Sequence, residues 1–326
     1  MRTELPLVTV LMATYNGARH ISEQIDSILA QTYSNIELVI ADDSSMDETV
    51  PILRSYKQKH PNIKLYINQI RLGFVKNFEQ LLQKADGKYF ALSDQDDIWD
   101  HDKISIMMQA LIEKEKKRPD APIMIHSDLK VIDEVGALIF PSYSLHRDYH
   151  FSNHKNIPMM LSKGGVMGNT ILLNNHLRQL ILPFDPDVMH HDYWIALINE
   201  IFGFRISLKE TLVSYRIHTH NTSNKMHLIS NQHQKNKKNI LPYQDNNRYK
   251  VLRGILQRFP IEKDDKRPII IFLKYLREQK NWLKYYRPLY KEGFIKNSIR
   301  THSKLLGRFT LASLKRKQAL KSSIQS

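Results

Sequence analysis

The run Asp94-Gln95-Asp96-Asp97 concentrates carboxylates at one point of the chain, directly after the apolar segment Tyr89–Leu92. That segment is short, aromatic and apolar, which predicts a buried strand. Because residues i and i+2 of an extended chain point to one side, Asp94 and Asp96 can face one cation while Asp97 points elsewhere. Carboxylate oxygens suit Mg²⁺ or Mn²⁺, which usually keep some waters and bridge to substrate phosphates. The alternative is that these acids make turns and cap the following helix.

A second acidic group, Asp42-Asp43-Ser44-Ser45, follows another apolar run, Ile36–Ala41. In nucleotide-binding α/β folds, an acid at such a strand end accepts hydrogen bonds from the ribose, and we expect one of these carboxylates to contact a ribose or base. The alternative is a helix cap, and we assign that role to Asp47, which precedes the helix expected from Glu48.

Two further groups lie later in the chain. His190-His191-Asp192 precedes a helical stretch, Tyr193–Ile201, and its carboxylate could act as a general base or simply cap the helix. The segment Tyr215–Asn221 contains Arg216 and His218. Arginine pairs with phosphate oxygens, and histidine can complete a metal shell or contact a diphosphate. A solvated strand edge is the alternative for this segment.

These groups need a scaffold that brings strand ends together. The apolar run Val8–Ala13 ends in Thr14-Tyr15-Asn16-Gly17, a turn signal, and is followed by apolar residues at helical spacing. The same order of strand and helix recurs twice before residue 100. Strands that alternate with helices predict a mostly parallel sheet with helices on both faces, in which ligands collect at the carboxyl ends of the strands.

The rest of the chain divides by composition. A charged helix (102–117), a strand (123–132) and a second strand (170–173) continue the α/β pattern, and residues 141–163, rich in aromatics and His, predict a long loop or lid. We therefore expect one catalytic domain over 1–225, a polar linker over 226–265 and a basic helical tail over 266–326.

Charge is concentrated in that tail. The 326 residues contain 48 Lys and Arg and 33 Asp and Glu, and the tail holds 16 of the basic residues with only two acids. The body is therefore close to neutral, unlike a uniformly basic nucleic-acid-binding protein. There is no cysteine, which excludes a disulfide framework, a thiolate metal site and a cysteine nucleophile.

No segment is long and apolar enough for a signal peptide or a spanning helix. In the tail, however, Ile269, Phe272, Leu273 and Leu276 share one helical face between Lys and Arg residues. Such a basic amphipathic helix is typical of peripheral attachment to an anionic leaflet, with the apolar stripe inserted shallowly. A solvated charged helix is the alternative.

Taken in order, these motifs resemble family 2 glycosyltransferases, the inverting enzymes of the GT-A fold. The resemblance runs from Val8 to about Asn224. Its landmarks are residues 10–17, Gln24…Gln31-Thr32, 40–45, Arg71-Leu-Gly-Phe with Asn77, 92–99 with Asp102-Lys103, Gly168-Asn169-Thr170, 191–194 and 214–218. The versions at 93–99, 191–194 and 215–218 look most like the branch described as rhamnosyltransferases of bacterial surface polysaccharide.

The resemblance implies a Rossmann-like, mixed but mostly parallel nucleotide-sugar-binding sheet flanked by helices, with the basic helical tail as an extension. It implies a donor that is a dTDP- or UDP-sugar, a divalent metal (Mn²⁺ or Mg²⁺), and a saccharide or lipid-linked acceptor. It also implies a cytoplasmic protein peripheral on the inner face of the cell membrane, with no nucleic-acid partner.

Roles carry over by position. The resemblance places Thr14, Tyr15, Asn16, Asp42, Arg71, Asp94 and Arg216 at the nucleotide sugar, Asp94, Asp96 and His218 at the metal, Asp192 as general base, and Gly168, Asn169 and His191 on the acceptor side. Ser44 stands where the family usually has Gly, and His191 where it usually has Glu. The first changes the turn at most, and the second leaves the carboxylate of Asp192 in place.

Two other functions remain open at this point. A sugar nucleotidylyltransferase would have a similar fold, but it should carry a Gly-rich, Arg-containing loop after the first strand, which Thr14-Tyr15-Asn16-Gly17-Ala18 is not. A nucleic-acid-binding protein would use the basic tail against phosphates with a steep salt dependence.

Overall fold

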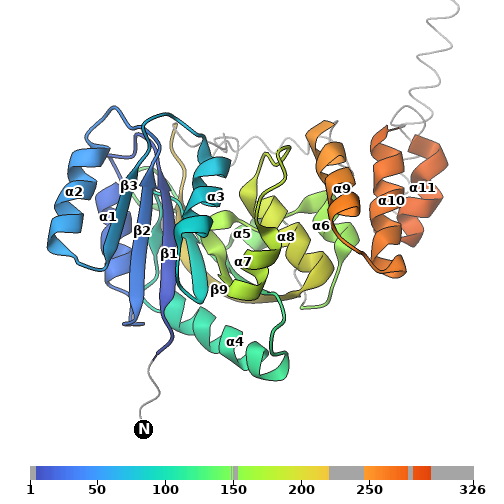
Figure 1. Ribbon diagram of the computed structural model, residues 1–326, viewed down its shortest axis with the longest axis horizontal. Coiled ribbons are helices and arrows are strands. Elements are labelled where there is room, and N and C mark those ends of the chain that lie inside the picture. Colours follow the sequence, from blue (N-terminus) through green and yellow to red (C-terminus); the bar gives the residue numbers. More distant parts are fainter. Residues whose placement is uncertain (1–4, 148, 150–152, 220–245, 278–281, 295–326) are drawn as a thin grey trace, which may run out of the picture.

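The computed structural model describes residues 5–147, 149, 153–219, 246–277 and 282–294 (Figure 1). Within these residues nine strands form one mixed sheet in the order β3-β2-β1-β4-β8-β6-β9-β5, with β7 beside β6. The strands are β1 Val8–Thr14, β2 Ile36–Asp42, β3 Ile63–Ile67, β4 Tyr89–Ser93, β5 Ile98–Trp99, β6 Ile123–Ile132, β7 Leu138–Phe140, β8 Ile171–Asn174 and β9 Phe204–Arg216.

The first four strands are parallel and set the position of the polar loops. The register of β1 against β2 places Thr14 opposite Asp42, and β1 against β4 places Met12 opposite Ser93. The turn after β1, the acidic loop after β2 and the Asp94–Asp97 loop after β4 therefore leave the sheet at one edge. The predicted α/β fold is confirmed, and the antiparallel strand β8 joins this half to β6 and β9.

Side chains on the strands alternate between two cores, as the period of two requires. Val10 and Met12 of β1 belong to one core, which is covered by α1 (Ile21–Leu29), α2 (Thr49–Lys59), α4 (Lys103–Lys117) and α5 (Tyr143–His146). Leu11 belongs to the other, which is covered by α3 (Phe74–Lys84), α6 (Ile157–Lys163), α7 (Asn175–Ile181), α8 (His191–Phe202), α9 (Asn246–Arg258), α10 (Lys263–Arg277) and α11 (Trp282–Lys291).

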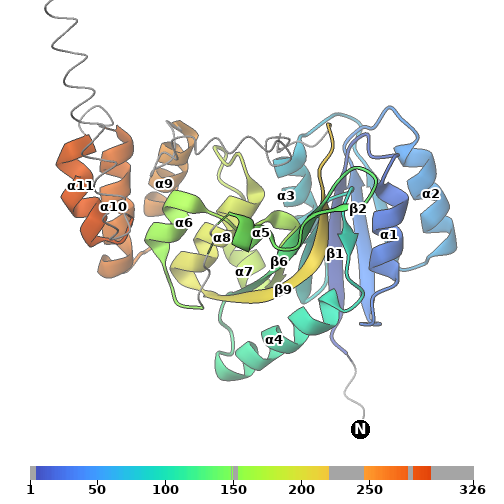
Figure 2. The ribbon, with the colours of Figure 1, turned by 180° about the vertical axis from the view of Figure 1, so that it is seen from behind.

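The last three helices differ from the expected linker and tail. Helix α9 forms inside the range predicted as a linker, and its Val251, Leu252 and Ile255 are buried in the core; residues 226–245 lie outside the described part. Helices α9, α10 and α11 line up beside α6 and α8, at the end of the molecule opposite α1 and α2 (Figures 1 and 2).

The apolar stripe of α10 is also buried. Ile269 and Phe272 have no exposed surface, and Leu273 and Leu276 are nearly covered, because α10 packs against α6, α9 and α11. The expectation that this stripe inserts into a membrane is therefore wrong: its apolar area is already removed from water within the protein. The part of the predicted tail over 295–326 lies outside the described residues.

The segment 141–163 is not simply a loop. Its described residues include the short helices α5 and α6, which begin where Ser142 Oγ accepts a hydrogen bond from Leu145 N and Asn156 Oδ1 accepts one from Met159 N. Such caps satisfy backbone donors that a helix start leaves open. Across the described residues, every helix is too short or too polar to cross a bilayer.

Candidate active site

The three acids of the loop after β4 lie in different surroundings. Asp94 is half-buried and lines a cavity, and Asp96 Oδ2 lies 2.8 Å from His218 Nε2. Asp97 is fully buried, and its Oδ1 accepts a hydrogen bond of 3.1 Å from Arg216 N. Asp97 thus lies in the interior, and the expectation that Asp94 and Asp96 face one cation stays a prediction.

Beneath this loop lies a buried polar network. Asn169 Nδ2 donates to Asp97 Oδ2, and Lys103 Nζ donates to Asn169 O at 2.7 Å while lying 3.3 Å from the centre of the Trp99 ring. Burial, with Asp96 and Asp94 nearby, raises the pKa of Asp97 well above its ordinary value. Burial likewise holds the pKa of Lys103 well below its ordinary value, while Asp97 and Asp94 oppose that shift.

In this network Asn169 has a different place from the predicted one, and Lys103 is a member that was not predicted. Asn169, expected on the acceptor side, is 1% exposed and holds Asp97 from behind the site. Sequence reasoning gave Lys103 no role. A signal was present, since Lys103 begins a helix in which Met107 and Leu111 lie about one and two turns further along. Its own side chain therefore starts on the buried face.

Arg216, expected at the diphosphate, braces the same loop. Its Nε donates to Asp96 O at 3.1 Å, one terminal nitrogen donates to Glu134 O at 3.0 Å, and the other pairs with Glu23 Oε2 at 2.5 Å. Arg216 is only 2% exposed. In this structure its guanidinium therefore fixes the backbone that carries Asp96.

Asp96 and His218 form the pair best suited to a divalent metal. Their carboxylate oxygen and imidazole nitrogen are ligand types that Mn²⁺ accepts, and a diphosphate would supply further oxygens. In the described part of the chain, no group of three or more His, Asp or Glu side chains is arranged around a common point. The residues therefore fit a metal held jointly by protein and substrate, rather than one caged by protein alone.

At the ends of β1 and β2, Asp42 organises the backbone. Its carboxylate accepts hydrogen bonds from Thr14 Oγ1 at 2.9 Å, Ser45 N at 2.9 Å and Ser45 Oγ at 2.5 Å. Ser44 lies between them at a φ of 66°, which a serine adopts at a cost in strain. Asp42 has no exposed surface. In this structure its own loop therefore covers the carboxylate that was predicted to contact the nucleotide base.

Tyr15, Asn16 and Arg71 lie around the same edge. Gln95 holds the backbone of Tyr15 through both its amide atoms, at 2.8 and 3.1 Å. The exposed Arg71 stacks its guanidinium 3.8 Å from the centre of the Tyr15 ring. Asn16 Oδ1 accepts a hydrogen bond from Met46 N at 2.9 Å, which ties the β1 turn to the β2 loop. This edge thus presents an aromatic ring and a cation beside the acidic loop.

A cavity of about 350 Å³ joins Asp94 to Asp192. Asp192 lies in the first turn of α8, and its Oδ1 accepts a hydrogen bond from Tyr193 N at 2.7 Å. The amide dipoles of the helix favour a negative charge at this end. Gly168 also lines the cavity, as do Met160 of α6 and the two glycines after it, Gly164 and Gly165.

His191 lies beside Asp192 and is 7% exposed. Its ring stacks on Phe78 with the ring centres 4.0 Å apart, and burial lowers its pKa to about 4. A Cβ added to Gly168 would lie 2.9 Å from His191 Nε2, so only glycine leaves room for the imidazole here. His191 is therefore a neutral ring that packs beneath the first turn of α8.

Helix α9 supplies a wall of the cavity that the sequence did not predict. Asn247, Arg248 and Val251 line it, and the Arg248 guanidinium lies 4.7 Å from the centre of the Tyr193 ring. These residues lie in the segment predicted to be a linker. The polar composition of that segment gave no sign that a helix there has a buried face.

Comparisons with known proteins agree with this arrangement. The family model described as glycosyl transferase family 2 matches residues 9–158. An uncharacterised glycosyltransferase of Rickettsia prowazekii is 30% identical over 230 residues, which cover 67% of this chain and 66% of the relative. An uncharacterised glycosyltransferase of Haemophilus influenzae is 30% identical over 238 residues, which cover 67% of this chain and 68% of the relative. The chain thus spans about two thirds of the length of these relatives.

Solved structures share the fold. A mannosyltransferase from Pyrobaculum calidifontis, in complex with GDP-Man and Mn²⁺, superposes with a TM-score of 0.58 at 19% identity, over 97% of this chain and 83% of that one. TarS 1–349 of S. aureus with UDP-GlcNAc gives 0.55 at 15% identity, over 86% of this chain and 76% of that one. With the sheet order, the acidic strand ends and the family match in agreement, the chain belongs to glycosyltransferase family 2 and is a glycosyltransferase.

Proposed function

We propose that this glycosyltransferase is an inverting, metal-dependent enzyme that moves a sugar from a nucleotide diphosphate to a hydroxyl of a saccharide or lipid-linked acceptor. The observation that carries the proposal is the cavity shared by Asp94 and Asp192. It joins the loop that would hold a donor to a carboxylate that can accept a proton. The solved neighbours with UDP-GlcNAc and with GDP-Man and Mn²⁺ support a nucleotide-sugar donor.

Asp192 is the general base of this proposal. It takes the proton of the acceptor hydroxyl, the oxygen attacks the anomeric carbon, and the bond from that carbon to the diphosphate breaks on the opposite side. The electron pair of that bond leaves with the diphosphate, so one base suffices and the sugar inverts. Asp192 lies in the first turn of α8, where the amide dipoles of the helix favour a negative charge.

The donor lies along the strand ends in this proposal. Tyr15 and Arg71 offer a stacked surface for the base, Thr14, Asn16 and Asp42 shape the loops around it, and Asp94 faces the sugar. Asp96 and His218 would hold Mn²⁺ or Mg²⁺, which neutralises charge on a diphosphate leaving group. Arg216 acts by fixing the Asp96 backbone.

The biological setting is the broadest part of the proposal. We propose a dTDP- or UDP-linked sugar, rhamnose first among candidates, and an acceptor of bacterial surface polysaccharide assembly. We place the protein in the cytoplasm, peripheral on the inner face of the cell membrane, with residues 266–326 toward the anionic leaflet. Membership in family 2 leaves the nucleotidylyltransferase and nucleic-acid-binding alternatives without a supporting observation.

Donor binding and transfer test this function separately. Purified protein would be titrated with UDP-, dTDP- and GDP-sugars in Mn²⁺, Mg²⁺ or EDTA. We expect one donor to bind only with metal, and Asp96→Asn to abolish that binding. Asp192→Asn should keep donor binding and lower transfer by about 10²- to 10⁴-fold, the usual contribution of a general base.

Asp86→Asn is the matched control, because Asp86 is an exposed acid before β4, at the end of that strand opposite Asp94. It should behave like the wild-type protein in both measurements. Binding of every donor in EDTA, or unchanged transfer by Asp192→Asn, would contradict the proposal.

A further inference from the structure

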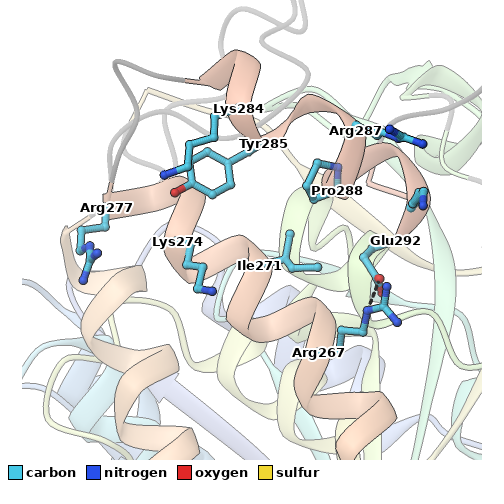
Figure 3. A pocket seen from close by; sticks show the side chains of 10 residues that line it. Arg267, Ile271, Lys274, Arg277, Lys284, Tyr285, Arg287, Pro288 and Glu292 are labelled. Atoms are coloured by element: carbon cyan, nitrogen blue, oxygen red, sulfur yellow. Dashed lines mark ion pairs between the residues drawn. The ribbon is translucent and has the colours of Figure 1, made fainter.

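One cavity lies far from the strand ends, between α10 and α11 (Figure 3). Its volume is about 840 Å³, within the range of small-molecule sites. Ten residues line it: Arg267, Ile271, Lys274, Arg277, Lys284, Tyr285, Arg287, Pro288, Lys291 and Glu292. We call it the α10–α11 cavity.

The lining is strongly cationic. Six of its residues are basic and one is acidic, which gives a formal charge of +5. The acid, Glu292, pairs with Arg267 at 2.7 Å, and Figure 3 shows this pair at one end of the cavity. The side chains of both helices gather around the remaining space. Arginine and lysine side chains collected in this way match the oxygens of phosphate groups.

The walls of the cavity are held by packing. Phe272 on the buried face of α10 stacks in parallel on Phe294, with ring centres 5.2 Å apart, and Leu289 of α11 has no exposed surface. The basic side chains Lys274, Arg287 and Lys291 therefore project from a fixed frame. A bound anion would offset the net positive charge that these side chains give to this part of the surface.

We propose that the α10–α11 cavity binds the phosphate groups of anionic membrane lipids. The proposal deepens the membrane part of the proposed function and rests on it. Because the apolar stripe of α10 is buried in the protein, a membrane contact made by these helices would use their charged side, where this cavity lies. The attraction of a basic surface to an anionic leaflet falls off within a Debye length, about 10 Å at 0.1 M salt.

Vesicle flotation of the full-length chain tests the proposal. The protein would be mixed with vesicles of phosphatidylcholine alone or with added phosphatidylglycerol. The variant Lys274→Gln/Arg287→Gln/Lys291→Gln removes three charges from the cavity. The control Arg54→Gln/Lys57→Gln/Lys59→Gln removes three exposed charges from α2, at the opposite end of the molecule (Figure 1).

We expect binding only to vesicles with phosphatidylglycerol, weakened by salt. The cavity variant should lose on the order of tenfold or more in affinity, since each basic residue near the leaflet contributes to binding, while the α2 control should match the wild type. Lys274→Arg/Lys291→Arg should keep binding, which separates charge from folding. Equal losses in both triple variants would overturn the proposal, as would no loss in the cavity variant.

Two further arms identify the source of the phosphate and separate this site from catalysis. Glycerol phosphate or inorganic phosphate that releases the protein from vesicles at low concentration would make the cavity a site for soluble phosphates and overturn the lipid assignment. Donor binding, measured without vesicles, should be the same for the cavity variant and the wild type. Vesicle binding with no donor binding would contradict the proposed function alone.

Discussion

At the scale of single residues, the site is built from groups whose charge is set by burial. His191 stacks on Phe78 and has a pKa of about 4, so it is neutral at pH 7 beside the carboxylate of Asp192. A protonated ring there would pair with that carboxylate and weaken it as a base. In the proposed mechanism, the neutral ring therefore leaves Asp192 able to accept the proton of an acceptor.

The same burial makes His191 a source of acid sensitivity. Its pKa in the folded protein is about 4, below the ordinary 6.5, so the unfolded chain takes up the proton first as pH falls. The stability present above pH 6.5 is therefore lost as pH falls toward 4. Denaturant unfolding should show that His191→Gln reduces the stability loss between pH 7 and pH 5 by about 2 kcal/mol.

His101→Gln is the control for that measurement, because the His101 side chain is 70% exposed. It should leave the pH dependence as it is in the wild type. Burial also lowers the pKa of His126, to about 3, so His126 too makes stability fall as pH falls. It does so equally in the wild type, His191→Gln and His101→Gln. An unchanged slope in His191→Gln would mean that His191 is not buried in the folded state.

At the scale of elements, the cavity depends on how closely the turn at Gly168–Thr170 approaches the start of α8. A Cβ on Gly168 would lie 2.9 Å from His191 Nε2 and 3.6 Å from Asp192 Cβ. An added methyl group would therefore displace the His191 ring, which packs beneath the first turn of α8, the turn that carries the proposed base. A displacement of about 1 Å at a reacting group can cost on the order of 100-fold in rate.

Gly168→Ala should lower transfer by tenfold or more while donor binding stays within twofold, because the donor loops lie on other strands. Steady-state kinetics with the donor found above would measure both effects. The double variant Gly168→Ala/His191→Ala removes the clash and should recover part of the lost rate. A double variant no faster than the single one would assign another role to Gly168.

The elements predicted correctly from the sequence are those whose run of apolar residues directly reflects how they are buried. The strands β1, β2 and β4 are continuous apolar runs, and their polar ends marked the correct edge of the sheet. Helix α9 was missed because its buried Val251, Leu252 and Ile255 stand among Asn, Lys and Arg, which give the segment a polar composition. The buried contacts of Asn169 and Arg216 depend on long-range packing, which no local pattern contains.

At the scale of the whole molecule, the C-terminal helices share a core with the catalytic half. Phe272 of α10 has no exposed surface and belongs to the same cluster as Leu11 of β1 and Trp194 of α8. The expected division into catalytic domain, linker and tail stays a prediction for residues outside the described part. For α9 and α10, the shared core predicts that both halves unfold together.

Phe272→Ala should cost about 3–5 kcal/mol, the usual penalty for removing a buried aromatic ring. Thermal unfolding would show a single transition at lower temperature, and donor binding would be lost in that same transition. Lys274→Ala, on the exposed face of the same helix, should change stability by less than about 0.5 kcal/mol. Two separate transitions, with donor binding lost only in the second, would show independent domains.

The order of synthesis gives the position of α9 a further consequence. All nine strands and the proposed base precede α9 in the chain, yet α9 supplies Arg248 and Val251 to the cavity and Leu252 to the core. A ribosome-bound chain that ends before α9 therefore leaves part of this apolar core uncovered and one wall of the cavity unfinished. Since such faces promote aggregation during folding, chaperones should hold the nascent chain until α9 and α10 emerge.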